Sequence, residues 1–282
     1  MAKIIGGLGT SHIPAIGGAI HRGAQQEPYW KPFFDGFPPV QQWLGQVKPD
    51  VVVMFYNDHG LNFFLDKMPT FAVGAAAQYN NADEGWGIPT LPPFKGEVDL
   101  SWEIINHLVD QEFDITTCQE MLVDHACTLP LKLFWPEGDC PVTVVPVCIN
   151  TVQFPLPNAK RVFALGRAVG EAVAQWDSDK KVAFVASGGL SHQLEGERAG
   201  FINKDFDLKF LESLENNPAW ATQFSIHELV EKTGTQGIEL LAWLAMRSAL
   251  SAGENSGVRK VHSNYHIPIS NTATGLLALE TY

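Results

Sequence analysis

The chain has 282 residues, 45% hydrophobic and 18% charged, which fits one large domain or two small ones with a sizeable core and excludes a disordered chain. Lys and Arg total 19 against 31 Asp and Glu, giving a formal net charge of -12. A protein this acidic lacks a general field for holding nucleic acid or an anionic membrane surface, so we expect neither as a partner.

Strand-like and helical segments alternate along the chain. Short runs rich in β-branched and aromatic residues predict buried strands at 51–56, 142–147 and 181–186, with a weaker strand at 3–8. Pro146 suggests that the 142–147 strand lies at an edge or ends there. Helical spacing of apolar residues predicts helices at 160–176 and 205–214. The alternation predicts a single α/β domain over 1–282, with a central, mostly buried mixed sheet flanked by helices and an active site at the strand C-terminal ends.

Three histidines follow predicted strands in the same way. A strand runs into a short small or polar segment, and then comes His12, His59 or His192. In open α/β sheets ligands bind beyond the carboxyl ends of strands, so these imidazoles could converge on one crevice. A single histidine at a strand end is more often a capping or surface residue, but three at the same kind of position favour a shared site.

Glu239 lies in a largely apolar segment that has helical spacing. A buried carboxylate without a partner is costly, whereas one bound to a metal or a cation is not. The segment therefore predicts either a metal ligand or a salt bridge, for example to Arg247, and on its own it leaves both open.

Two histidines and one carboxylate form the facial triad of non-haem Fe(II) oxygenases, which leaves three coordination positions open. A catechol can chelate through two oxygens while O₂ takes the third position. A further histidine that is not a ligand can serve as acid and base. The residues alone do not decide which of His12, His59 and His192 is not a ligand.

Two further segments carry candidate site residues. His125 follows Asp124 between apolar stretches and is a plausible site residue. Ser270 and Asn271 come just before an apolar run at 272–277. If a helix begins there, its free N–H groups and these side chains would form a small anion site. The alternative is an ordinary cap or turn.

The sequence resembles the catalytic β subunits of protocatechuate 4,5-dioxygenases, in the type II extradiol family. The resemblance runs in order along nearly the whole chain and rests on a set of short segments: Ser-His-Ile-Pro-Ala at 11–15, Tyr-Asn-Asp-His at 56–59, Pro-Thr-Phe-Ala at 69–72, Ala-Asp-Glu-Gly-Trp-Gly at 82–87, Val-Asp-His-Ala-Cys-Thr at 123–128, Gly-Gly-Leu-Ser-His-Gln-Leu at 188–194, Arg-Ala-Gly-Phe-Ile-Asn-Lys at 198–204, Gly-Ile-Glu-Leu at 237–240 and Tyr-His-Ile-Pro-Ile-Ser-Asn-Thr-Ala at 265–273. One such segment is weak evidence, but the ordered set is strong.

The resemblance implies a role for each candidate residue. His12, His59 and Glu239 would bind Fe(II), and His192 would act as general base and acid. His125 would lie beside bound substrate and oxygen, while Ser270 and Asn271 would hold the substrate carboxylate. The implied reaction is cleavage of protocatechuate between C4 and C5 by O₂, which gives 4-carboxy-2-hydroxymuconate semialdehyde.

The resemblance also implies a small α subunit in an α2β2 assembly. The chain has no room for that subunit as a fused domain, so we expect a separate partner. The aromatic segment at 29–34 would suit an interface or the protein's own core equally well. The four cysteines show no Cys-x-x-Cys spacing, and no apolar run resembles a signal peptide or approaches the roughly 20 residues that span a bilayer, so we expect a cytoplasmic protein.

Rival functions remain open at this point. The substrate could be gallate or 3-O-methylgallate, because pocket shape decides between such close analogues. An aminophenol-cleaving relative would not need a carboxylate site. The same fold could also serve a Zn(II) hydrolase or a non-catalytic binding protein of the Memo type, because fold does not fix function.

Overall fold

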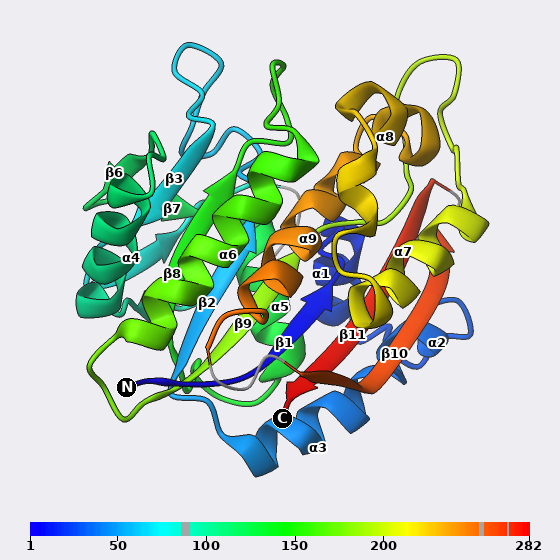
Figure 1. Ribbon diagram of the computed structural model, residues 1–282. Helices are drawn as coiled ribbons and strands as arrows, with labels where there is room; N and C mark the ends of the chain where they lie inside the picture. Colours follow the sequence, from blue (N-terminus) through cyan, green and yellow to red (C-terminus); the bar gives the residue numbers. More distant parts are fainter. Residues whose placement is uncertain (86–90, 254–256, 270) are drawn as a thin grey trace.

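The most apolar runs of the sequence form the centre of a mixed β-sheet (Figure 1). The computed structural model describes residues 1–85, 91–253, 257–269 and 271–282. Within these residues the sheet has eight strands, in the spatial order β10 (Val258–Ile269), β11 (Thr272–Thr281), β1 (Lys3–Thr10), β9 (Lys181–Ser187), β2 (Val51–Tyr56), β8 (Thr143–Ile149), β3 (Phe71–Gly74) and β6 (Thr116–Cys118). The prediction of an α/β domain with a mixed central sheet is therefore confirmed.

The four central strands β1, β9, β2 and β8 run parallel to one another. Strand β11 pairs antiparallel with β1, and β3 pairs antiparallel with β8. All four strands that the sequence predicted are among the parallel four. Every residue of β2 is buried, as expected for a parallel strand that is covered on both faces.

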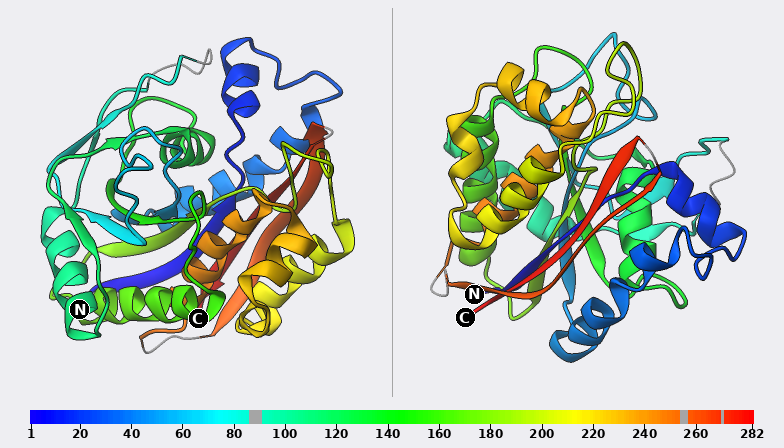
Figure 2. Two further views of the ribbon diagram at one scale, coloured as in Figure 1. Left: turned by 90° about the horizontal axis from the view of Figure 1, so that it is seen from above. Right: turned by 90° about the vertical axis from the view of Figure 1, so that its right-hand side faces the viewer.

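Helices cover both faces of this sheet, which Figure 2 shows from above and from the side. One face carries α4 (Val98–Asp110), α6 (Ala159–Gln175), α7 (Lys204–Asn216), α8 (Ile226–Thr233) and α9 (Leu240–Ala249), with 3₁₀ turns η1 (Trp220–Gln223) and η2 (Gly237–Glu239). The other face carries α1 (Pro14–His21), α2 (Lys31–Phe34), α3 (Phe37–Val47) and α5 (His125–Phe134). A small sheet of β5 (Phe94–Lys95), β4 (Gln78–Asn81) and β7 (Leu122–Val123) lies beside them.

Each face of the sheet has its own apolar core. Alternate residues of β2 point to opposite sides, so Val53 packs with the α6 and α9 cluster and Met54 with the α3 and α5 cluster. In the 29–34 segment Trp30 and Phe33 are buried in the second core, whereas Tyr29 is exposed. That segment therefore mainly fills the protein's own interior.

The expectation that Pro146 marks an edge or a strand end is wrong. β8 lies between β2 and β3, and Pro146 pairs in register with Met54 of β2. The pairing of β3 with β8 ends at Val147, so β3 does not pair with the proline, which lacks an N–H. An internal strand can thus hold a proline where one neighbouring strand is short.

Candidate active site

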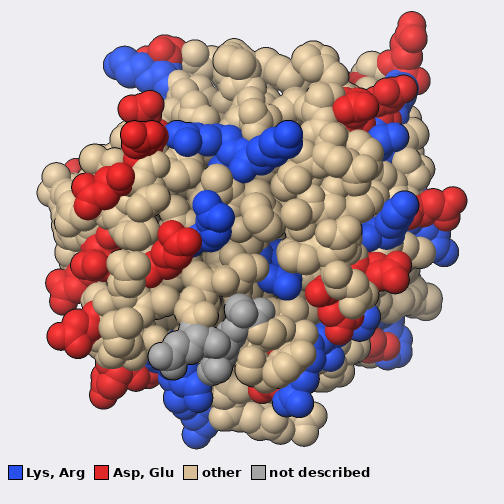
Figure 3. All heavy atoms as spheres, in the orientation of Figure 1, with Lys and Arg blue, Asp and Glu red and all other residues tan. Residues whose placement is uncertain are grey.

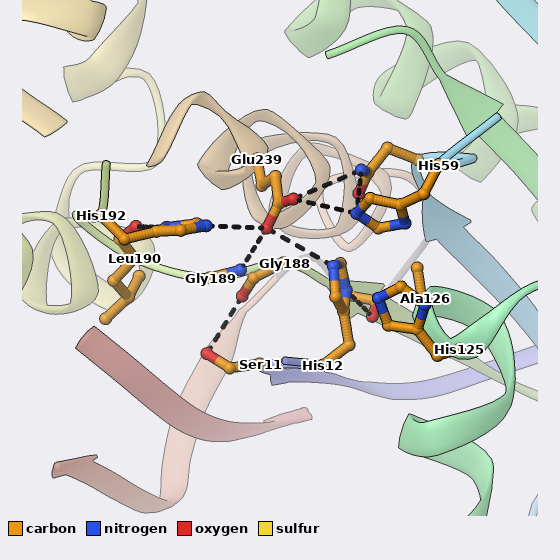
Figure 4. A network of polar contacts seen from close by, with 12 residues as sticks. Ser11, His12, His59, His125, Ala126, Gly188, Gly189, Leu190, His192 and Glu239 are labelled. Carbon is orange, nitrogen blue, oxygen red and sulfur yellow. Dashed lines mark hydrogen bonds and ion pairs between the residues drawn. The ribbon is translucent and has the colours of Figure 1, made fainter. Parts of the chain in front are cut away.

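Three adjacent strands carry the three strand-end histidines to one place. Strands β1, β9 and β2 are neighbours, with Thr10 paired to Ser187 and Phe55 paired to Ala186, so their carboxyl ends lie level. His12, His59 and His192 follow these ends. Figure 4 shows their rings gathered around Glu239, as the strand-end pattern predicted.

Glu239 is the acidic centre of this cluster. It ends η2 immediately before α9, a helix whose ten residues are all buried. The side chain of Glu239 is itself only 9% exposed. Its Oε2 accepts a hydrogen bond from the Gly189 N–H at 2.7 Å, and its Oε1 accepts one from the Asn57 amide at 3.3 Å.

Two imidazoles face the two carboxylate oxygens at equal distances. His12 Nε2 lies 3.5 Å from Oε2 of Glu239, and His59 Nε2 lies 3.5 Å from Oε1. The alternative that Glu239 pairs with Arg247 is wrong, because Arg247 bonds the Leu214 carbonyl and the Ser251 hydroxyl instead.

The rings of His12 and His59 are held from behind. His12 Nδ1 lies 2.7 Å from Ser187 Oγ at the end of β9. His59 donates both its backbone N–H and its Nδ1–H to Asp124 Oδ2, each at 2.8 Å. A histidine ligand commonly uses its second nitrogen in this way, which fixes the ring and leaves Nε2 for a metal.

The charges in this cluster are strongly coupled. Burial alone would raise the pKa of Glu239, but the charge of His12 and hydrogen bonds from His12 and His59 hold that pKa well below its usual value. Burial likewise would lower the pKa of His59, yet Asp124 and Glu239 hold it well above its usual value. For His12 burial prevails, and its pKa is lowered. The site thus stabilises an ionised carboxylate next to positive charge, which a bound cation would supply.

His192 occupies the opposite side of Glu239 from His59 (Figure 4). Its Nδ1 lies 2.8 Å from the Leu190 carbonyl oxygen, and its Nε2 lies 4.0 Å from Glu239 Oε2. A carbonyl oxygen can only accept a hydrogen bond, so Nδ1 carries the proton. In the neutral ring Nε2 is then the basic atom, and it faces the site.

The Gly188-Gly189 pair permits this close packing. A Cβ on Gly188 would lie 2.8 Å from the Glu239 carbonyl oxygen, and one on Gly189 would lie 2.5 Å from the His192 ring. Any side chain at either position would therefore displace the carboxylate or the imidazole.

His125 completes the cluster as the first residue of α5. Its ring stacks on His59 with centroids 4.4 Å apart, and it meets His12 edge-on at 5.3 Å. Glu84 binds it twice: the backbone N–H of His125 donates to Oε1 at 2.6 Å, and the ring Nδ1 donates to Oε2 at 2.5 Å. Neighbouring residues Asp124 and His125 thus belong to two stacked carboxylate–imidazole pairs.

The structure offers more than one set of possible metal ligands. Ligand atoms of His12, His59 and His125 lie within 4.8 Å of one another, as do those of Glu84, Asp124 and His125. Both carboxylates of the second set already accept N–H groups of the histidines. Glu239 is a further buried carboxylate, and the Nε2 atoms of His12 and His59 that face it make these three residues another possible ligand set.

The alternative to a helix start holds here, because Thr272 begins strand β11 and Asn271 lies in the turn before it. Ile269 pairs with Thr272 between β10 and β11. Thr272 also bridges to His192, which places Asn271 next to the segment that carries this histidine. Ser270 lies outside the described residues.

Four polar residues in or beside the site were not singled out from the sequence as members of it. Asn57 and Ser187 lie within the strand-end segments, so their positions were a usable signal. The sequence contains weaker indications of the other two: Glu84 lies in the 82–87 segment of the family resemblance, and Asp124 is the N-cap residue of α5. Their partners are 41 and 65 residues distant in sequence, which no local pattern reveals.

The chain is similar to a known family of proteins. The family model described as the catalytic LigB subunit of aromatic ring-opening dioxygenase matches residues 6–275. The chain belongs to this family. Its members are extradiol ring-cleavage dioxygenases, and the histidine and carboxylate cluster is a possible metal site for such an enzyme.

Individual curated proteins are also similar to this chain in sequence. Gallate dioxygenase of Pseudomonas putida is 38% identical over 200 residues, which cover 71% of this chain and 57% of that protein. The 2,3-dihydroxyphenylpropionate/2,3-dihydroxicinnamic acid 1,2-dioxygenase of Azotobacter vinelandii is 30% identical over 275 residues, covering 80% and 84%. The enzyme of the same name from Photorhabdus laumondii is 28% identical, covering 95% and 94%. The chain thus aligns with little more than half of the gallate dioxygenase.

Among the described helices, none combines the length and the apolar character needed to cross a membrane.

Proposed function

We propose that this chain is the catalytic subunit of an Fe(II)-dependent extradiol dioxygenase that opens the ring of a carboxylated catechol. The observation that carries the proposal is the convergence of His12 and His59 on the two oxygens of buried Glu239, each at 3.5 Å. Membership of the ring-opening dioxygenase family supports it independently.

The donor set fits Fe(II). Two imidazole nitrogens and one carboxylate form a triad that leaves coordination positions open for substrate and O₂. His12, His59 and Glu239 would hold the ion, with Ser187 and Asp124 fixing the two rings. Bound Fe(II) would lower the pKa of the substrate hydroxyls and couple the diol electronically to O₂.

His192 would transfer the protons. Its Nδ1–H is fixed by the Leu190 carbonyl, so neutral His192 presents Nε2 to the site as a base. We infer that Nε2 takes a proton from a substrate hydroxyl and later returns it to an oxygen atom during ring opening. The same atom can do both because the ring needs no rotation between the two steps.

His125 and Asn271 would orient the substrate. The ring of His125 stacks on that of His59, a proposed metal ligand, so it could contact an oxygen atom of a bound substrate or of O₂. Asn271 lies near His192 through the Thr272 bridge and can donate its amide hydrogens to a carboxylate. Ser270 belongs to the same proposal because it directly precedes Asn271 in the sequence.

The substrate is proposed from similarity. The named substrate of the Pseudomonas relative is gallate, so this relative favours gallate over protocatechuate, which the sequence resemblance alone had implied. Gallate and protocatechuate both carry vicinal hydroxyls opposite a carboxylate and differ by one hydroxyl. The substrate class is therefore a hydroxylated benzoate, with gallate placed before protocatechuate and 3-O-methylgallate.

Oxygen consumption by the Fe(II)-loaded protein tests this function. We expect uptake with gallate or protocatechuate, one O₂ per substrate, and both atoms of ¹⁸O₂ in the ring-opened product. A His192→Ala variant should bind iron normally and turn over at least 100-fold more slowly. Iron-loaded protein that consumes no O₂ with gallate, protocatechuate or 3-O-methylgallate would contradict the proposal.

A small second subunit remains part of the proposal. The loops that follow β2, β8 and β9 carry exposed apolar side chains at the same end of the sheet as the site, among them Phe64, Phe154 and Leu194.

Figure 3 shows that basic and acidic side chains are interspersed on the face that it displays, so its described residues form no broad basic area there. A partner that covers the site should change KM and kcat when it is added in stoichiometric amount.

A further inference from the structure

A second buried carboxylate lies behind the candidate base. Asp207, in the first turn of α7, is 1% exposed. Its Oδ1 accepts the Ser191 N–H at 2.9 Å, and its Oδ2 accepts the Ser191 hydroxyl at 2.6 Å and the Tyr265 hydroxyl at 3.0 Å. Burial raises the pKa of Asp207, and the hydrogen bonds from Ser191 and Tyr265 oppose that rise.

We propose that Asp207 is a positioning residue that sets the orientation of His192 and links the segment of His192 to strand β10. The proposal rests on the proposed function of His192 as proton acceptor. Asp207 does not touch the reacting atoms and acts through Ser191, the residue directly before His192.

The segment around His192 is fixed at several points, and Asp207 provides the side-chain anchor. The His192 N–H bonds the Thr233 carbonyl at 2.8 Å, and the His192 carbonyl accepts the Gly237 N–H at 3.2 Å. These bonds hold the backbone, while the ring is oriented by its bond to the Leu190 carbonyl. A shift of Ser191 would move Leu190 and His192 relative to each other and weaken that bond.

Asp207 also links this segment to the β10–β11 hairpin. Tyr265 belongs to β10, which leads into the turn containing Asn271. On the other strand, Ala273 donates its N–H to the Ser191 carbonyl at 3.1 Å and accepts the Leu190 N–H at 3.0 Å. One carboxylate therefore joins the candidate base to the strand that precedes the candidate carboxylate-binding turn.

A carboxylate suits this arrangement because both of its oxygens accept hydrogen bonds. The Ser191 hydroxyl already accepts the Asn203 N–H at 2.8 Å and donates its own hydrogen to Asp207. All three groups that face Asp207 donate to it. An asparagine would present one oxygen and one NH₂, so with its oxygen on the Ser191 N–H the two hydroxyls would have to turn into acceptors and their own hydrogens would lose the Asp207 acceptor.

The test compares Asp207→Asn with Tyr265→Phe, which removes only one of the three hydrogen bonds. Asp205→Asn is the matched control, since Asp205 is exposed in the same first turn of α7. We expect kcat to fall 10- to 100-fold in Asp207→Asn, an effect of the size seen when outer-shell partners are removed, and less in Tyr265→Phe. KM and iron content should stay within about twofold of the wild-type values.

Two further readouts separate positioning from simple destabilisation. The kcat loss should be smaller with 4-nitrocatechol, because this more acidic diol ionises with less help from a base. In ¹⁵N NMR of the metal-free protein, His192 should show the Nδ1–H tautomer, and Asp207→Asn should shift its ring signals. The NMR comparison needs no turnover, so it tests the positioning even if the proposed reaction is wrong.

Unchanged kcat together with unchanged His192 signals in Asp207→Asn would overturn the proposal. A variant with low iron content but normal kcat per bound iron would also overturn it, because that result describes a structural residue only. If Asp207→Asn does not fold, Tyr265→Phe decides: a selective loss of kcat supports the proposal, and wild-type kcat with wild-type His192 signals refutes it.

Discussion

Replacing Asp124 by asparagine should weaken metal binding, because this carboxylate holds His59 in place. Asp124 Oδ2 accepts both N–H groups of His59 at 2.8 Å, while Oδ1 accepts the Ala126 N–H at 3.0 Å and caps α5. Although burial opposes it, the positive charge on His59 lowers the pKa of Asp124 to about 2. The side chain therefore stays charged at neutral pH and serves donors at both of its oxygens.

An amide cannot serve both ends. If its oxygen faces His59, its NH₂ meets the Ala126 N–H, and losing the cap costs about 1 kcal/mol. If it turns over, two buried His59 donors lose their acceptor, at about 1–3 kcal/mol each. The first orientation costs less, so we expect the free energy of unfolding of Asp124→Asn to be about 1–2 kcal/mol lower than that of the wild type. The loss of the carboxylate behind a metal ligand should lower Fe(II) affinity 10- to 100-fold.

Anaerobic Fe(II) titration and urea unfolding of the metal-free protein measure these two effects separately. Asp66→Asn is the control, because that carboxylate is 67% exposed. It should leave both values unchanged. An Asp124→Asn variant that binds Fe(II) within twofold of the wild-type affinity would refute the assignment of His59 as a ligand supported by Asp124.

Three other outcomes follow from the structure. Glu84→Gln can accept only one of the two N–H groups that His125 donates, so kcat should fall 10- to 100-fold at unchanged iron content, and wild-type kcat would contradict the pairing. Burial raises the pKa of Cys118 to about 11, so at pH 8 its thiolate fraction is on the order of 0.1%. Alkylation of the Cys118 thiol, followed by peptide mapping, should therefore be roughly 100-fold slower in the native protein than in urea. Equal rates would argue against burial of this thiol. Arg259 donates a hydrogen bond to Glu280 and lowers the pKa of Glu280 below 4.5, so this pair stabilises the fold above that pH and the contribution is lost as the pH falls. Arg259→Ala should therefore lower the free energy of unfolding by less than about 1 kcal/mol at pH 7 and by almost nothing at pH 3. A larger effect at pH 3 than at pH 7 would contradict this.

The strand-end histidines were predictable because their signal is local. A run such as 51–56 is apolar at every position, which indicates a strand covered on both faces, and the following polar residues then lie at a strand end. Parallel strands bring such ends to one edge of the sheet. The order of the strands was not predictable, because crossover connections decide that β9 lies between β1 and β2.

Glu239 shows where a periodic pattern fails. The sequence indicated a helix with a buried carboxylate, and the residue is indeed buried, but it lies in a 3₁₀ turn just before α9. Since every residue of α9 is buried, its sequence has no polar face that could mark where the helix begins. Burial was therefore predictable and the local geometry was not.

The turn before β11 and the role of Asp207 both depend on contacts between residues that are far apart in the sequence. Polar residues before an apolar run can cap a helix or form a turn, and pairing of β11 with β1, more than 260 residues away, selects the turn. Asp207 looked like an ordinary acidic residue at a helix start. Its partners Ser191 and Tyr265 lie 16 and 58 residues away, so its role emerges only in the folded chain.

The central claim is that Glu239, with His12 and His59, binds the Fe(II) that supports ring opening. It is tested most directly by measuring iron content and O₂ consumption in Glu239→Gln and His125→Ala beside the wild type. We expect Glu239→Gln to lose both iron and activity, and His125→Ala to keep about one iron per chain and turn over slowly. Iron retained by Glu239→Gln and lost by His125→Ala would contradict the account and assign the third ligand to His125.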